Sequence, residues 1–234
     1  MEEKSVLEHL SELRFRLILI TIFFVGFFVV GFAASDYIMR RVSYDLFSPD
    51  VRLIAMHPLE YVLVKINIGI FFAVILSIPL VLYHVFAFLK PGLTKREVRI
   101  AKLSMVSGFV LFVIGFLFSY FVLLRVVVWF FGSLASSAGI ANLWGVNYFV
   151  NFVFLTCITM GLVFELPVVS IALVKTGLID VESLSKKRGY AIILIFVVAA
   201  IITPPDPVTQ ILVALPMILL FEISVFLTKI VSSR

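Results

Sequence analysis

The chain has 234 residues, of which 62% are hydrophobic and 14% are charged, and its formal net charge is +5. A soluble domain is typically about half apolar and about a quarter charged, so these proportions exclude a soluble protein and indicate a membrane protein that crosses the bilayer several times. The one cysteine, Cys157, cannot form a disulfide within the chain. The three histidines show no metal-ligand spacing, and the sequence contains no Gly-rich phosphate loop. We therefore expect no metal, no cofactor and no enzyme activity.

Six apolar stretches are candidates for membrane spans, because a membrane helix needs about 20 predominantly apolar residues. They cover residues 17–34, 59–89, 103–134, 146–174, 189–203 and 208–230. The segment before the first stretch lacks the basic region and the cleavage site of a signal peptide, so we expect this span to remain in the mature protein. The second to fourth stretches reach about 45 Å as helices, whereas the fifth reaches only about 22 Å at about 1.5 Å per residue.

Three prolines lie inside these stretches, and each removes a helical hydrogen bond and favours a kink. They are Pro79, Pro167 and Pro216. The sequence therefore predicts an all-α integral membrane protein with a single six-span membrane domain over residues 1–234. We expect a cupped, kinked bundle in which the last two helices are short, and local thinning of the bilayer beside them.

The basic residues predict the orientation of the chain. Of the 19 Lys and Arg residues, 14 fall on the side of the two termini and 5 fall on or toward the other side. Because basic residues are enriched in cytoplasmic loops, we expect both termini in the cytoplasm. This topology accounts for the positive net charge, so we expect no nucleic-acid partner.

One polar stripe runs along the fourth predicted span. At 100° per residue, Asn147, Asn151 and Glu165 fall within about 40° of one another on a helix. A charge at the middle of a span costs about 2.5–3.5 kcal/mol on insertion scales, which favours a functional role for Glu165 over a purely structural one. A proton relay and a polar contact with another helix both remain open.

Small residues share one face of the third predicted span. They are Ser104, Gly108, Gly115 and Ser119, which fall within about 60° of one another. Such a face permits close packing between helices. We interpret it as an internal packing surface.

Two acids lie near the predicted cytoplasmic ends of spans. Glu12 precedes Arg16 by four residues, a spacing that predicts an ordinary solvated ion pair on one helix. Glu97 follows Thr94 by three residues, a spacing typical of a capping box at the start of a helix. From spacing alone, both acids are interpreted as structural.

Five stretches, in this order along the chain, resemble the TatC family, the polytopic receptor component of the twin-arginine protein translocase. They are HLSELRFRL (9–17), FLKPGLTKRE (88–97), FELPVV (164–169), SKKRGY (185–190) and TPPDPVTQ (203–210). Together they are spread over nearly the whole length of the chain. One departure is SPD at 48–50, where relatives often have Pro-Leu, although Pro49 itself matches.

The resemblance implies the core receptor of twin-arginine export, a multi-pass protein of the cell (inner) membrane. Such a receptor binds the twin-arginine signal peptides of folded precursors at its cytoplasmic face. It docks single-span TatA-like and TatB-like partners, forms homo-oligomers within the receptor complex, and works in translocation driven by the proton-motive force. It is not an enzyme.

The resemblance also implies roles for single residues. The signal-recognition acids match Glu12 and Glu97, with Phe88, Leu10 and Arg14 in the same patch. Two carboxylates could read two consecutive arginines, because a guanidinium bonds a carboxylate through two parallel hydrogen bonds and a lysine ammonium does not.

The mid-membrane acid of the family matches Glu165, which we expect to dock a polar residue of a TatA-like or TatB-like helix along the Asn147–Asn151–Glu165 face. The other family motif residues match Pro49, Pro91, Asp206 and Gln210. The rival interpretation is a proton-coupled small-molecule transporter with Glu165 as its relay. An inverted repeat, common in such transporters, is not evident in the sequence. A purely structural scaffold is a third alternative.

Overall fold

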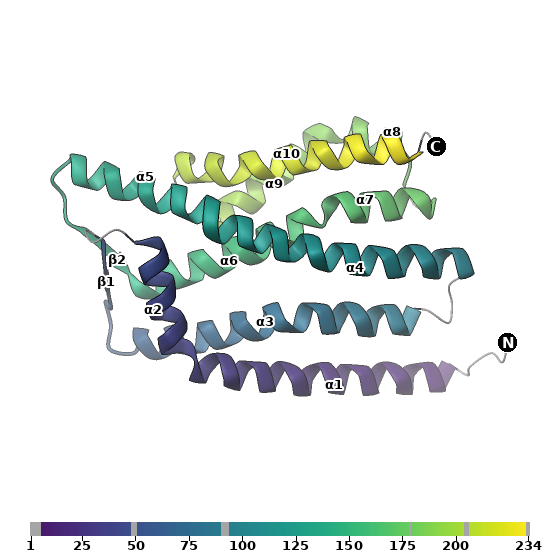
Figure 1. The fold of residues 1–234 in the computed structure, drawn as a ribbon, viewed down its shortest axis with the longest axis horizontal. Coiled ribbons are helices and arrows are strands. Elements are labelled where there is room, and N and C mark those ends of the chain that lie inside the picture. The colour runs from purple at the N-terminus through teal and green to yellow at the C-terminus, as the bar shows by residue number, and fades with distance from the viewer. Residues whose placement is uncertain (1–5, 48–50, 90–93, 178, 204–205, 233–234) are drawn as a thin grey trace.

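The computed structural model describes residues 6–47, 51–89, 94–177, 179–203 and 206–232 (Figure 1). Its helices are α1 (Val6–Ala33), α2 (Ser35–Leu46), α3 (Glu60–Leu89), α4 (Lys95–Phe118), α5 (Leu124–Ser137), α6 (Val146–Phe164), α7 (Leu166–Lys175), α8 (Val181–Lys186), α9 (Arg188–Ile202) and α10 (Pro207–Ser232). A π-helical turn, Ser119–Leu123, joins α4 to α5. Two short strands complete the fold, β1 (Val51–Ile54) and β2 (Asn142–Gly145).

The long helices run side by side along one axis, and α2 lies across them (Figure 1). We call the end of the bundle that carries both chain termini the termini end, and the end that carries α2, β1 and β2 the cap end. Because both termini lie at one end, the chain passes along the bundle an even number of times. The short helix α9 therefore provides a return pass.

Five helical segments of the described chain are long and apolar enough to cross a membrane. They are Leu10–Ala33, Glu60–Phe88, Val98–Ser137, Val146–Lys175 and Pro207–Val231. Of the two helices predicted to be short, α9 is an apolar helix of 15 residues. The last helix, α10, has 26 residues, so the prediction that it is short is wrong. Most of these segments begin and end within a few residues of the predicted spans, because apolar length determines both. A count of six membrane-crossing helices remains a prediction.

Glycines allow two of the helix pairs to approach closely. A Cβ at Gly31 of α1 would lie 2.6 Å from Phe72 of α3, so α1 packs directly on α3. A Cβ at Gly115 of α4 would lie 2.7 Å from the backbone oxygen of Met160, and one at Gly161 of α6 would lie 2.5 Å from the ring of Phe112. Gly115, on the small face predicted for the third span, therefore packs against α6.

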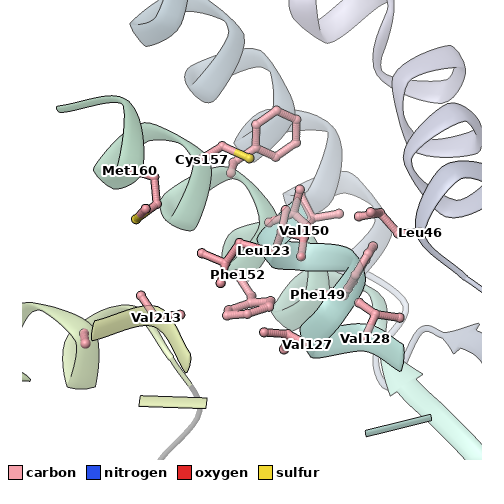
Figure 2. Close-up of a cluster of buried hydrophobic side chains, with 14 of the residues drawn as sticks. Leu46, Leu123, Val127, Val128, Phe149, Val150, Phe152, Cys157, Met160 and Val213 are labelled. Atoms are coloured by element: carbon pink, nitrogen blue, oxygen red, sulfur yellow. The ribbon is translucent and has the colours of Figure 1, made fainter. Parts of the chain in front are cut away.

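The core is centred on α6, and Figure 2 shows part of it. Phe149, Val150 and Phe152 of α6 are buried against Val127 of α5, with Val213 of α10 on another side. Most residues of α6 are apolar, so the helix can pack against other helices on several faces. Its position at the centre of the bundle agrees with this composition.

The cap end is organised by a parallel strand pair and by one carboxylate. Val51 pairs with Asn142, and the register continues to Ile54 and Gly145. Glu60, at the first position of α3, accepts a hydrogen bond from the backbone N–H of Met56 and another, at 3.1 Å, from the backbone N–H of Asn147. This side chain is 9% exposed, so it ties three segments together away from solvent.

The fourth predicted span consists of two helices. α6 ends at Phe164 and α7 begins at Leu166, so Glu165 lies at the break. Pro167 lacks a backbone N–H and so cannot continue the hydrogen-bond pattern of α6. The other two span prolines, Pro79 and Pro216, lie inside α3 and α10, which continue past them.

We predict opposite effects of an added methyl group at two helical glycines. Gly115→Ala should lower the free energy of unfolding by about 1–3 kcal/mol, because the Met160 carbonyl is backbone and overpacking has this typical cost. Gly26→Ala should leave stability unchanged or raise it, because a Cβ there has nothing within 4 Å. Thermal unfolding of both variants in detergent tests the difference, and equal behaviour would contradict the α4–α6 contact.

Candidate functional site

The Glu12 carboxylate lies near the start of α1, at the termini end, and it already holds a guanidinium. Its Oε1 accepts hydrogen bonds from Nη2 and Nε of Arg16 at 2.5 Å and 3.2 Å. Nη1 of Arg16 lies 3.4 Å from Nδ1 of His84 on α3. Only 20% of the Glu12 side chain and 19% of the Arg16 side chain are exposed. The predicted ion pair therefore forms, but the prediction that it is solvated is wrong, because Arg16 also contacts α3.

Leu10 and Arg14 occupy a different face of α1 from Glu12. Both side chains are exposed and line a shallow groove along α1 with Leu17. Phe88 lies half-buried near the end of α3. The structure therefore brings these residues to the same end of the bundle, but it directs Leu10 and Arg14 outward and Glu12 toward α3.

Glu97 is the third residue of α4, and its backbone is helical. The helix begins directly after Thr94, whose carbonyl accepts a hydrogen bond from the backbone N–H of Val98 at 2.9 Å. The side chain of Glu97 and the motif residues Pro49 and Pro91 lie outside what the structure describes. α4 starts at the termini end, as α1 does (Figure 1).

Glu165 faces a cavity between α3, α4 and α7 in the half of the bundle nearer the termini end. The cavity has a volume of about 330 Å³, and apart from Glu165 its polar lining residues are Ser104 and Thr176. The carboxyl carbon would lie 3.9 Å from a Cβ at Gly108, so the small face of α4 makes room for the carboxylate. Pro167 follows it at the start of α7.

One oxygen of the Glu165 carboxylate, Oε1, is buried and has no hydrogen-bond partner among the described residues. A buried polar atom without a partner costs about 1–3 kcal/mol. The described residues therefore leave the hydrogen-bonding capacity of this oxygen unused. This property sets Glu165 apart from the carboxylates at the cap end.

Asn147 and Asn151 lie toward the cap end and are bonded within the bundle. Oδ1 of Asn147 accepts from Nδ2 of Asn67 on α3 at 2.8 Å and from Nδ2 of Asn151 at 3.4 Å. At 1.5 Å rise per residue, Asn151 and Glu165 are about 21 Å apart along the helices. The structure therefore does not bring the two asparagines and Glu165 into one site.

Asp206 and Gln210 fix the start of α10. Oδ1 of Asp206 accepts from the backbone N–H of Thr209 at 2.8 Å, and Oδ2 accepts from the hydroxyl of the same residue. Nε2 of Gln210 donates to the backbone carbonyl of Phe196 on α9 at 3.0 Å. Asp206 thus acts as a helix N-cap, and Gln210 joins the two C-terminal helices.

Sequence reasoning missed two further polar clusters near α2. Asp36 accepts from Nζ of Lys65 at 2.8 Å and from the hydroxyl of Tyr61. These two hydrogen bonds hold the pKa of Asp36 below its ordinary value, and the bond from Lys65 has the larger effect. Asp45 accepts from the hydroxyl of Tyr120 at 2.9 Å. The only sign of these clusters in the sequence is that isolated acids lie in a segment too polar to span a membrane.

No group of three or more His, Cys, Asp or Glu side chains that could hold a metal occurs in the part of the chain that the structure describes. The candidate sites are therefore the Glu12 region at the termini end and the Glu165 cavity. Both present carboxylates, which suits them to recognise cationic or hydrogen-bonding groups of other chains.

Comparison with known proteins extends over almost the full length of the chain. The family model described as "Sec-independent protein translocase protein (TatC)" matches residues 8–216. The chain belongs to the TatC family. It is therefore a membrane protein of a protein translocase family and not an enzyme, as the sequence predicted.

Curated TatC proteins from two bacteria show the extent of the likeness. The protein from Aquifex aeolicus is 34% identical over 232 residues, which cover 97% of this chain and 95% of that protein. The protein from Halalkalibacterium halodurans is 32% identical over 228 residues, covering 97% and 90%. Both carry the name Sec-independent protein translocase protein TatC.

Two solved structures share the fold. One, described as "Crystal Structure of Twin Arginine Translocase Receptor- TatC", superimposes with a TM-score of 0.86 at 34% identity and covers 96% of this chain and all of that one. The other, of a TatC receptor in the detergent DDM, gives a TM-score of 0.83 at 34% identity and covers 94% of this chain. The arrangement in Figure 1 is therefore that of TatC.

Proposed function

We propose that this chain is the core receptor of a twin-arginine export system in the cell (inner) membrane. It binds the twin-arginine signal peptides of folded precursors at the termini end, which faces the cytoplasm. The observation that carries the proposal is the position of Glu12 and of the start of α4, which bears Glu97, at one end of a TatC-family chain. The excess of basic residues at this end supports the cytoplasmic orientation.

The contact between Arg16 and Glu12 supports this role for Glu12, because an arginine of a signal peptide would make the same kind of contact. The Arg16 guanidinium contacts Glu12 through two nitrogens, at 2.5 Å and 3.2 Å, in a partly buried setting. An incoming arginine would share this carboxylate with Arg16 or displace it. A lysine would not reproduce the two-nitrogen contact, because its ammonium is a point charge. Arg16 is thus an internal competitor of the signal peptide.

Glu165 is proposed as the docking point of a TatA-like or TatB-like single-span helix. The buried Oε1 without a described partner fits a polar residue on such a helix, and the apolar lining of the cavity fits the side chains around it. Asn147 and Asn151 serve this role only indirectly, because they join α6 to α3. Export by the assembled homo-oligomeric receptor and its partners is driven by the proton-motive force.

A proton relay through Glu165 is less well supported. A relay needs a series of titratable groups or waters, and the only other polar side chains that line the cavity among the described residues are hydroxyls. The polar Asn147–Asn151 pair lies too far toward the cap end to continue a path from Glu165.

We predict that Glu12→Ala and Glu97→Ala each weaken binding of a twin-arginine peptide at least tenfold, because a hydrogen bond to a charged group contributes about 1.5–3 kcal/mol. Arg16→Gln should strengthen binding, because it removes the internal competitor. Glu182→Ala is the control, since Glu182 is an exposed acid of α8 paired with Lys186. Isothermal titration with a signal peptide and with its twin-lysine variant measures these effects. Unchanged affinity in both acid variants would remove the recognition site from this end.

Substitutions at Glu165 separate docking from a proton relay. Glu165→Gln keeps the hydrogen-bonding capacity and cannot release a proton, so docking predicts that it retains most crosslinking to the single-span partner and most export. Glu165→Leu should lose both. Ser104→Ala, in the same cavity, should behave as the parent chain. Loss of export in Glu165→Gln equal to that in Glu165→Leu would support the relay, and full export by Glu165→Leu would reject both roles.

A further inference from the structure

A second cavity, of about 410 Å³, lies beneath α2 at the cap end of the bundle. Its volume is within the range of sites that bind small molecules, about 300–1,000 Å³. The walls come from α3, from the end of α4 with the π turn, and from α6, and α2 covers one end. Most of the lining is apolar, including Phe72, Ile75, Leu76, Phe116, Leu117 and Phe154.

This cavity opens to the bilayer and not to the core. Two of its lining residues, Leu76 and Leu117, are 39% and 45% exposed. Both lie in membrane-spanning segments, where the surroundings of an exposed side chain are lipid. Val153 and Cys157 of α6, which form its floor, are 1% exposed. An apolar cavity with exposed apolar walls at membrane depth is accessible to lipid chains.

Two guanidinium groups lie near this cavity, and one of them lines it. Arg41 of α2 lines it directly. Arg125 of α5 lies over the ring of Phe121, another lining residue, at 5.6 Å from the ring centroid. No carboxylate of the described chain pairs with Arg125. An apolar cavity therefore has cationic groups at its cap end.

The Arg41 side chain contacts two residues of its own helix. Its Nε lies 3.1 Å from Oδ2 of Asp45, and the guanidinium lies 5.8 Å from the ring centroid of Tyr44. The same Asp45 oxygen accepts from Tyr120 of the π turn, so α2 is tied to the wall of the cavity. A guanidinium has five N–H donors, and the ion pair through Nε leaves the two terminal nitrogens to donate to an anion. The side chain of Arg41 is 60% exposed.

We propose that this cavity binds an anionic phospholipid from the leaflet at the cap end. One acyl chain lies between α3 and α4, and Arg41 and Arg125 bind the phosphate and the remaining headgroup charge. A phospholipid has the required order of groups, an anion followed by an apolar chain. A transmembrane helix of a partner offers no anion at this position and would extend far beyond a cavity that α2 closes at one end.

The test compares lipids and variants of the purified full chain in detergent. Phosphatidylglycerol should raise the melting temperature and stay bound in native mass spectra, phosphatidylcholine with the same acyl chains should bind more weakly, and inorganic phosphate should have no effect. Arg41→Gln should weaken phosphatidylglycerol binding about tenfold or more, the loss expected for hydrogen bonds to a charged group. Arg52→Gln is the charge-matched control, because Arg52 is exposed on β1 and does not line the cavity.

A second variant keeps both arginines and fills the chain site. Leu76→Trp places a larger side chain at the cavity wall and should lower phospholipid retention as strongly as Arg41→Gln does. Its melting temperature without added lipid shows that the chain is folded. Undiminished retention in both variants, or a phosphate effect as large as that of the lipid, would overturn the proposal. A photocrosslink from position 117 to a single-span partner and not to lipid would also overturn it.

Discussion

Gly115 and Gly161 bring the backbones of α4 and α6 into direct contact, since no Cβ fits at either position. α6 ends within one turn of this contact, at Glu165, where Pro167 interrupts the helical hydrogen bonds. Gly108, two turns before Gly115 on α4, then leaves space for the carboxylate. The packing of the two helices and the helix break together account for the position of Glu165.

Both cavities lie along the gap between α3 and α4, and they differ in their polar groups. The cavity nearer the termini end contains a carboxylate, Glu165, and the one at the cap end has guanidinium groups at its edge, among them Arg41. Acidic groups suit recognition of cationic or polar chains, and basic groups suit phosphate. On the proposed orientation, one side of the protein serves precursors and partner helices and the other side serves lipid.

Much of the fold was predictable because the length of an apolar stretch limits where a membrane helix can begin and end. The small face of α4 was predictable for a different reason, because helical periodicity places Gly108 and Gly115 together. The amphipathic helix α2 was not, because Arg40 and Arg41 make the segment resemble a loop. Periodicity placed Asn147 and Glu165 on one face, but it could not show that Asn67, far away in the sequence, bonds Asn147.

Site-specific photocrosslinking of a folded precursor most directly tests the claim that the termini end receives signal peptides. The photoreactive residue is placed at Lys95, exposed at the start of α4, and for comparison at Tyr44, exposed on α2 at the cap end. We predict a crosslink to a twin-arginine precursor from position 95 only, and its loss when both arginines of the precursor are replaced by lysine. A crosslink from position 44 alone, or one from position 95 that is indifferent to that replacement, would contradict the account.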